Sequence, residues 1–185
     1  MTRQLLRVLR ELYLVKSYDC LSLSELWLTQ SEFHLLRHLK KDFTIIFHTA
    51  TQQEHGRSFG DTALLLSKSN FKDTPTILKE DCVSAVHTSL SSRNIVVLSL
   101  YLQCISAKAD YLQIYRSQLA SLTGIIKQFT DFTDPILLGD FQCCHATLNP
   151  SRSGKPNILT KYLSDFINEN ELLPIDFSSS PRKLC

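Results

Sequence analysis

The first residues of the chain show the spacing of an amphipathic helix. Apolar side chains recur at every third or fourth position, at Leu5, Leu6, Leu9, Leu12 and Tyr13, with basic residues between them. This spacing gathers the apolar side chains on one helix face and therefore predicts a helix that packs on a core.

A short strand and a second helix are predicted next. Residues 19–25 alternate polar and apolar positions, as a half-buried strand does, and they end in an acid. Thr29, followed three positions later by Glu32, is typical of a helix start, because these side chains can accept N–H groups of the first turn. The apolar positions of this second helix run from Phe33 to Leu39.

From residue 44 onward the pattern is typical of strands. Four segments have an apolar period of two or are uniformly apolar, and they cover residues 44–47, 62–66, 83–86 and 94–101. A loop around residues 54–60 separates the first two. These segments predict one or more sheets.

The last third of the chain combines helices with one more strand. Residues 107–129 predict a long helix, in which Gly124 costs about 1 kcal/mol relative to alanine. Asp134 and the proline after it predict a turn into a strand over residues 136–141, and residues 158–168 predict a final helix. Strands and helices mixed in this order predict a layered α/β or α+β domain.

Length and composition are those of one globular domain. The chain has 185 residues, 43% hydrophobic and 21% charged, with a net charge of +2. We expect a single domain over residues 1–185, with a polar tail over 177–185. No segment approaches the ~18 apolar residues of a membrane helix, and the first residues lack a signal-peptide core. We therefore expect an intracellular protein, nuclear or cytoplasmic, without membrane contact.

The six cysteines favour a reduced, structural role. None forms a Cys-x-x-Cys pair, and Cys20, Cys82 and Cys104 lie within apolar segments, where cysteine acts as a small buried apolar residue. Disulfides and metal binding by thiolates are not predicted.

Two acids and one tyrosine are candidates for chemistry because each ends a predicted strand. Glu25 and Asp140 directly follow apolar segments, and ligands of layered α/β sheets gather beyond the carboxyl ends of strands. Two carboxylates brought together could hold a hard cation such as Mg²⁺. Tyr101 could contact a phosphate. The alternative remains open that both acids end their strands in solvent and that Tyr101 is a core residue with its hydroxyl at the rim.

The order of these segments resembles the endonuclease/exonuclease/phosphatase superfamily, and within it the endonuclease domain of LINE-type non-LTR retrotransposons. Five segments carry the resemblance: residues 19–28 (DCLSLSELWL), 60–69 (GDTALLLSKS), 95–101 (IVVLSLY), 138–145 (LGDFQCCH) and 149–153 (NPSRS). Each segment is weak alone, but together they occur in the order of the family's motifs and cover most of the chain.

This resemblance implies a fold, an activity and roles for three residues. The fold would be a two-sheet α/β sandwich of the DNase I-like type, and the activity Mg²⁺- or Mn²⁺-dependent hydrolysis of phosphodiesters in DNA. By position, Glu25 matches the metal-binding glutamate and Tyr101 the tyrosine on the scissile phosphate. Asp140 matches the aspartate that activates water or protonates the leaving group. No small-molecule cofactor is implied.

The chain departs from the family's pattern in three places. The family carries an Asn on a strand before the first helix, but the first Asn of this chain is Asn70. Gln142 stands where the family has Asn, and its amide reaches roughly 1.5 Å further, whereas catalytic placement tolerates about 0.5 Å. The family's closing Ser-Asp-His motif has no counterpart, since His145 is the last histidine. We therefore expect a sandwich truncated at its N-terminal strand and its C-terminal strands.

Two functions follow from these matches and departures. The chain is either a divalent-metal-dependent DNA endonuclease domain, with full or weakened activity, or an inactive remnant of one that binds nucleic acid or protein. His145 fits the retroelement motif as a loop-shaping residue rather than a catalytic one. Arg152, Lys155 and Lys161 could contact a DNA backbone, but a solvated surface is the simpler interpretation.

Overall fold

The computed structural model describes residues 18–26, 30–49, 61–71, 76–80, 83–90, 93–102, 110–129, 134–143 and 158–174. Two units make up the chain: Met1–Leu102 with Phe129–Asp140, and Gln103–Gln128 with Phe141–Cys185. The helix predicted near residues 5–13, the capping residue Thr29 and the predicted loop and tail segments lie outside the described residues.

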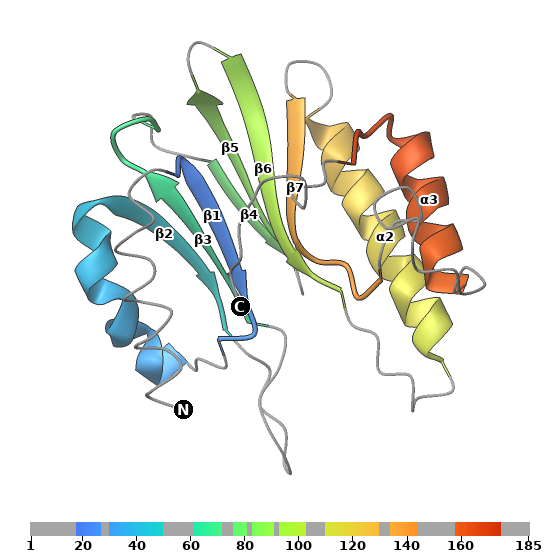
Figure 1. The fold of residues 1–185 in the computed structure, drawn as a ribbon, viewed down its shortest axis with the longest axis horizontal. Helices are drawn as coiled ribbons and strands as arrows, with labels where there is room; N and C mark the ends of the chain where they lie inside the picture. The colour runs from blue at the N-terminus through green and yellow to red at the C-terminus, as the bar shows by residue number, and fades with distance from the viewer. Residues whose placement is uncertain are drawn as a thin grey trace, which may run out of the picture. The chain divides into compact units, whose positions relative to one another are not determined.

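The first unit contains a three-stranded antiparallel sheet. Its strands are β1 (Cys20–Ser24), β2 (Phe43–His48) and β3 (Thr62–Ser67), in the order β1-β3-β2 (Figure 1). The central strand β3 is the most apolar of the three and is buried along nearly its whole length. This is expected of a strand that is covered on both faces.

A second sheet of the same unit has four described strands. They are β4 (Thr76–Glu80), β5 (Val83–Leu90), β6 (Arg93–Tyr101) and β7 (Asp134–Asp140), in that order across the sheet (Figure 1). β4, β5 and β6 are antiparallel, whereas β7 runs parallel to β6. The carboxyl ends of β6 and β7 therefore meet at the same edge.

The two sheets pack face to face through one apolar layer. Alternate residues of each strand point into it, as the period of two predicts. The buried residues of this layer are Ile46, Leu64, Leu66, Phe71, Val86, Ile95 and Val97, with Cys20, Leu90 and Leu138 packed against them.

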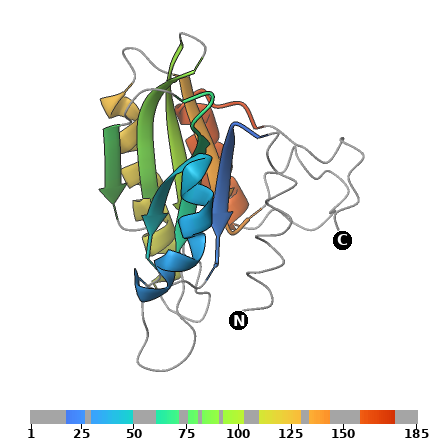
Figure 2. The same cartoon turned by 90° about the vertical axis from the view of Figure 1, so that its left-hand side faces the viewer.

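A helix covers the outer face of the three-stranded sheet. It is η1 (Gln30–Lys41), a 3₁₀ helix, and Figure 2 looks onto it with the strands behind. Leu36 and Leu39 pack against Phe43, Phe47 and the β3 residues that point outward. The ring of Phe33 stacks on that of Phe47, with centroids 5.0 Å apart.

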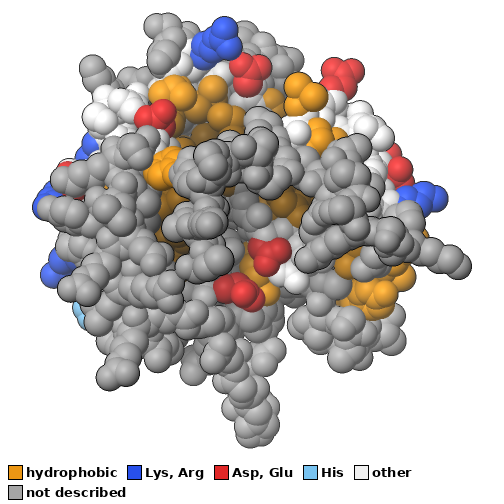
Figure 3. Space-filling model, viewed as in Figure 1, with side chains coloured by type: hydrophobic (Ala, Val, Ile, Leu, Met, Phe, Trp, Pro, Cys, Tyr) orange, Lys and Arg blue, Asp and Glu red, His pale blue; other side chains and the backbone are white. Residues whose placement is uncertain are grey.

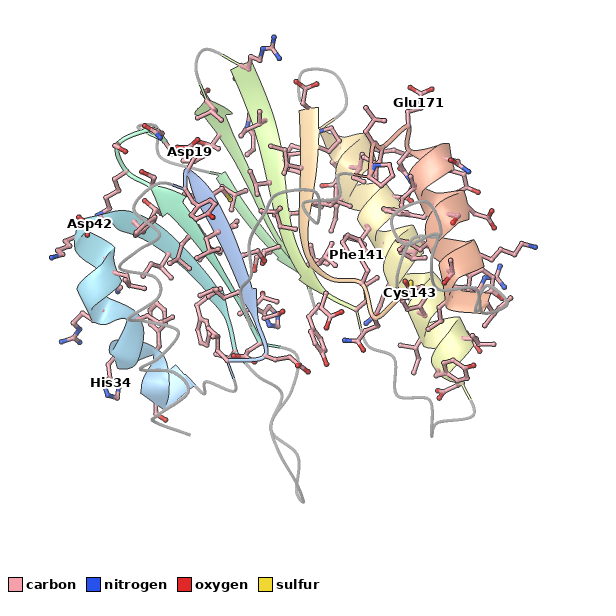
Figure 4. All side chains as sticks on the ribbon, in the orientation of Figure 1. Asp19, His34, Asp42, Phe141, Cys143 and Glu171 are labelled. Carbon is pink, nitrogen blue, oxygen red and sulfur yellow. The ribbon has the colours of Figure 1, made fainter. Side chains whose placement is uncertain are left out.

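The second unit is built on two helices, α2 (Tyr111–Gln128) and α3 (Ile158–Glu169). The Asn170 amide, which donates to Phe166 O at 2.8 Å and to Thr123 Oγ1 at 3.2 Å, ties the end of α3 to α2. The Tyr115 hydroxyl donates to Phe141 O at 2.9 Å, so residues 141–143 lie beside α2 (Figure 4). No helix in the described part of the chain combines the length and apolar character that a membrane crossing requires.

Most predicted elements are confirmed, with two corrections. The sequence pattern missed β4, a short strand that ends in Lys79 and Glu80. Asp134 and Pro135 do not form a turn but begin β7, which has a described neighbour on one side only. A proline is tolerated there because the first residues of an edge strand need not donate a hydrogen bond to a neighbour.

Cys20 and Cys143, two of the described cysteines, do not take part in disulfides. Burial, followed by the negative charge of the neighbouring Asp19, raises the pKa of the Cys20 thiol from 9.0 to about 12. Cys20 is therefore a neutral thiol at physiological pH, which agrees with the structural role predicted for it.

Alanine substitutions at Gly139 and Gly124 should have opposite effects on the free energy of unfolding. Gly139 has φ +140°, and a Cβ there would lie 1.9 Å from the carbonyl oxygen of Leu100. Gly139→Ala should destabilise the protein by about 3 kcal/mol or more, because it combines backbone strain with a clash in the β6–β7 pair. Urea denaturation measures this change.

Gly124→Ala is the matched control in the interior of α2. A Cβ at Gly124 meets nothing within 4 Å. This substitution should stabilise the protein by about 0.5–1 kcal/mol, because alanine loses less conformational entropy in a helix. Equal effects of the two substitutions would contradict the close approach at Gly139.

Candidate functional site

The three predicted site residues lie at one edge of the first unit. Tyr101 ends β6 and Asp140 ends β7, and the two residues are paired in register. Glu25 directly follows β1 in the other sheet. The Tyr101 hydroxyl donates to Oε1 of Glu25 at 2.8 Å and so connects the ends of two sheets. The structure thus brings together side chains that are 76 positions apart in the sequence.

A further carboxylate, Asp61, belongs to the same edge. It immediately precedes β3 and is completely buried. Its carbonyl oxygen accepts the N–H of Glu25 at 3.1 Å, so the backbones of the two acids are adjacent. The sequence places Asp61 in the motif-like segment 60–69, directly before the predicted strand 62–66, and no role was predicted for it. The sequence offers one signal for this residue, which is an acid placed directly before a mostly apolar strand segment.

The backbone at Glu25 is held in an unusual conformation. Its φ is 56°, in the left-handed region that residues other than glycine rarely adopt. Such a conformation costs of order 1–3 kcal/mol and persists only where neighbouring contacts hold it. Here the hydrogen bonds to Asp61 and from Tyr101 fix the residue at both its backbone and its side chain.

Hydroxyl groups replace apolar side chains in the inter-sheet layer next to this edge. Ser22 of β1 and Ser99 of β6 form a hydrogen bond of 2.8 Å between their hydroxyls. Ser84 lies opposite Ser99 in register, and Thr62 lies opposite both Ser24 and His48. The inter-sheet layer therefore changes from apolar to polar toward Tyr101 and Glu25.

The environment of Tyr101 keeps its phenol protonated. Burial is the largest cause that raises the pKa of Tyr101 above its ordinary value of 10.0, followed by the hydrogen bond to Glu25. The negative charges of Glu25, Asp140 and Asp61 raise it further. Tyr101 is therefore a hydrogen-bond donor at physiological pH, and three carboxylates lie close enough to act on its phenol.

The chemistry of these donors fits a hard divalent cation. They are oxygen groups, the ligands that Mg²⁺ prefers, and Mg²⁺ is usually bound by one or two carboxylates while it keeps several waters. Among the described residues, no three His, Cys, Asp or Glu side chains are grouped closely enough to ligate one ion. Figure 3 shows acidic side chains near one another at the centre of the face in view.

The other residues of the sequence analysis are not brought to this edge by any described contact. Gln142 has φ 56° and belongs to the second unit, and Lys161 is exposed on α3. His145, Arg152 and Lys155 lie outside the described residues.

Comparison with known proteins shows a shared fold. No protein-family pattern and no curated protein sequence matches the chain. Its structure is similar to that of the AP endonuclease LMAP from Leishmania major, with a TM-score of 0.66 and 14% identity over 91% of this chain and 63% of that one. It is also similar to the 3′ phosphatase NExo from Neisseria bound to a product DNA hairpin, with a TM-score of 0.60 and 14% identity over 88% and 66% of the two chains.

A third similar structure is that of TDP2 from D. rerio complexed with a single-strand DNA product, with a TM-score of 0.54 and 15% identity over 91% of this chain and 58% of that one. All three are members of the endonuclease/exonuclease/phosphatase superfamily. The present chain therefore has the DNase I-like α/β fold that its motifs imply, and it spans 58–66% of the lengths of these proteins.

The raised pKa of Tyr101 predicts a pH dependence of stability. In the unfolded chain this phenol ionises near its ordinary value of 10.0, whereas the folded protein keeps it protonated to higher pH. Its contribution to the free energy of unfolding is therefore fully present below about pH 10 and is lost as the pH rises further. Urea denaturation between pH 8 and 11.5, roughly the range that brackets this titration, should show a smaller decrease for Tyr101→Phe than for the unchanged protein.

Tyr111→Phe in the second unit serves as the control. It should keep the pH dependence of the unchanged protein, because Tyr111 is not part of the edge that contains Glu25. If Tyr101→Phe and the unchanged protein lost stability in parallel above pH 10, roughly the ordinary phenol pKa, the account of Tyr101 would be wrong.

Proposed function

We propose that this chain hydrolyses phosphate esters of DNA in a reaction that requires a divalent cation. The observation that carries the proposal is the hydrogen bond between Tyr101 and Glu25 beside the Asp140 strand end. At this edge the Glu25 carboxylate is suited to bind a cation, and the protonated Tyr101 phenol is suited to donate to a phosphate oxygen. Asp140 supplies a second carboxylate. The DNase I-like fold supports it, because similar structures include an AP endonuclease and a DNA-bound 3′ phosphatase.

Each residue has a part that its chemistry allows. Glu25, oriented by Tyr101 and by its strained backbone, would hold Mg²⁺ or Mn²⁺ together with Asp140. Such a cation would supply polarisation of a phosphoryl oxygen and offset its negative charge. Tyr101 has one hydroxyl proton, which it donates to Glu25 in the structure and would donate to a phosphate oxygen instead when DNA is bound. Asp140 would accept a proton from the water that attacks phosphorus, while the P–O ester bond breaks and the leaving oxygen takes a proton from solvent.

The motifs of the sequence narrow the proposal to one branch of the superfamily. The segments at residues 19–28, 60–69, 95–101, 138–145 and 149–153 resemble the endonuclease domain of LINE-type retrotransposons. We therefore assign endonucleolytic cleavage of a DNA strand as the reaction, within a single domain over residues 1–185 that acts inside the cell.

An inactive DNA-binding remnant is the second candidate function. The observation that favours it is Gln142 in place of the family's Asn, which lengthens the side chain that follows Asp140 by one methylene. A catalytic amide displaced by roughly 1.5 Å would lose much of its effect on rate.

Nicking of supercoiled plasmid with Mg²⁺ or Mn²⁺ separates the two functions. The folded full chain should convert supercoiled to open-circular DNA, and the chelator EDTA should abolish the reaction. Glu25→Gln and Asp140→Asn should each reduce the rate by about 10²–10⁴-fold, because each removes a group that stabilises charge or moves a proton.

Asp42→Asn is the matched control for these variants. Asp42, labelled in Figure 4, is an exposed acid of the same unit that directly precedes β2, whereas the end of β2 at His48 pairs with Thr62 beside the site. The Asp42→Asn variant should nick supercoiled plasmid at the same rate as the unchanged protein. If all variants and the unchanged protein nicked equally, the activity would be a contaminant. DNA binding without nicking would instead support the remnant.

A further inference from the structure

Two side-chain hydrogen bonds link the same two strands across the inter-sheet layer. One joins the hydroxyls of Ser22 in β1 and Ser99 in β6, here called the serine pair, at 2.8 Å. The other joins Tyr101, two residues further along β6, to Glu25, which directly follows β1. The serine pair therefore lies just behind the candidate site, on the two strands that lead into it.

Apolar packing leaves the alignment of these two strands along their length unrestrained. β1 and β6 belong to different sheets, so no shared backbone ladder sets how far one has moved along the other. The apolar contact fixes the separation of the sheets, but it is non-directional and changes little when one strand slides. A hydrogen bond between two short side chains is directional and restrains that sliding.

The direction of the Ser99 hydroxyl supports such a role for the serine pair. Its direct neighbour in the sheet is Ser84, whose hydroxyl is equally buried and has no hydrogen-bond partner in the described part of the chain. Ser99 nevertheless bonds across the layer to Ser22. Stability alone does not require this bond, because replacing both partners of a buried hydrogen bond by apolar groups of the same shape is often nearly neutral.

We propose that Ser22 and Ser99 are positioning residues, whose hydrogen bond sets the alignment of β1 with β6 at which the Glu25 carboxylate meets the Tyr101 hydroxyl. Only about 7 Å of strand separates Ser99 from Tyr101, so a displacement at the serine pair reaches the site. The catalytic consequence rests on the proposed function, in which side chains must be placed within about 0.5 Å. The contact between Tyr101 and Glu25 can be tested without it.

Ser22→Thr and Ser22→Val test the hydroxyl separately from the shape of the side chain. Threonine keeps a hydroxyl and valine has a methyl group in its place, and both residues suit a half-buried strand position. In each background of the full chain, urea denaturation measures how much Tyr101→Phe lowers the folding equilibrium constant. We expect about 10-fold in the unchanged and Ser22→Thr backgrounds, and about 2-fold in the Ser22→Val background.

Ser84→Ala is the matched control, because it removes an equally buried hydroxyl from the same layer. In that background Tyr101→Phe should still lower the folding equilibrium constant about 10-fold. Ser99→Ala removes the other hydroxyl of the serine pair without adding atoms, and it replaces Ser22→Val if that variant does not fold. A merely structural role would lower stability but leave the effect of Tyr101→Phe unchanged, and this result would overturn the inference.

Plasmid nicking separates failure of this inference from failure of the proposed function. Ser22→Val should lower kcat by about 10- to 100-fold with KM nearly unchanged, because it displaces groups that act in the transition state. Ser22→Thr and Ser84→Ala should retain kcat. If the chain never nicks but Ser22→Val weakens the Tyr101 contact, the positioning role holds and the proposed function is wrong. If the chain nicks and that contact is unchanged in Ser22→Val, only the positioning role is wrong.

Discussion

The apolar contact between the two sheets of the first unit is the interaction on which its other features depend. Ile46, Leu64 and Leu66 of one sheet pack against Val86, Ile95 and Val97 of the other. This contact fixes the distance between strands β1 and β6, which are not hydrogen-bonded neighbours within a sheet. Because that distance is fixed, the Ser22 and Ser99 hydroxyls can form a hydrogen bond of 2.8 Å. Two residues further along β6, the Tyr101 hydroxyl can reach the Glu25 carboxylate.

The same layer explains why the site lies where it does. Apolar packing must end at an edge, and there the side chains change to Ser, Thr, Tyr and acids. Gathering three carboxylates around a buried phenol opposes folding, and the left-handed backbone at Glu25 adds strain. Both costs are tolerated because the apolar layer behind them supplies the stability. The edge therefore concentrates negative charge at one end of the apolar layer.

Most of the fold could be predicted because its strands and helices have clear periods. The segments 44–47, 62–66 and 94–101 lie within β2, β3 and β6, and the apolar stripe of α2 is buried at Tyr115, Leu119 and Leu122. β4 was missed because a five-residue strand carrying Lys79 and Glu80 has no apolar alternation to detect. Asp61 was missed for a different reason. Only the pairing of β1 with β3 brings it next to Glu25, and no local pattern encodes that contact.

The close approach at Gly139 also affects how the chain selects its strand pairing. Parallel strands that meet late in folding can in principle align in several registers, and a shift by one residue would turn every side chain to the wrong face. In the observed register Gly139 lies opposite Leu100, and at its φ of +140° a Cβ would overlap the Leu100 carbonyl oxygen. The lack of a side chain at Gly139 therefore permits the close pairing of β6 and β7 in which Asp140 lies beside Tyr101.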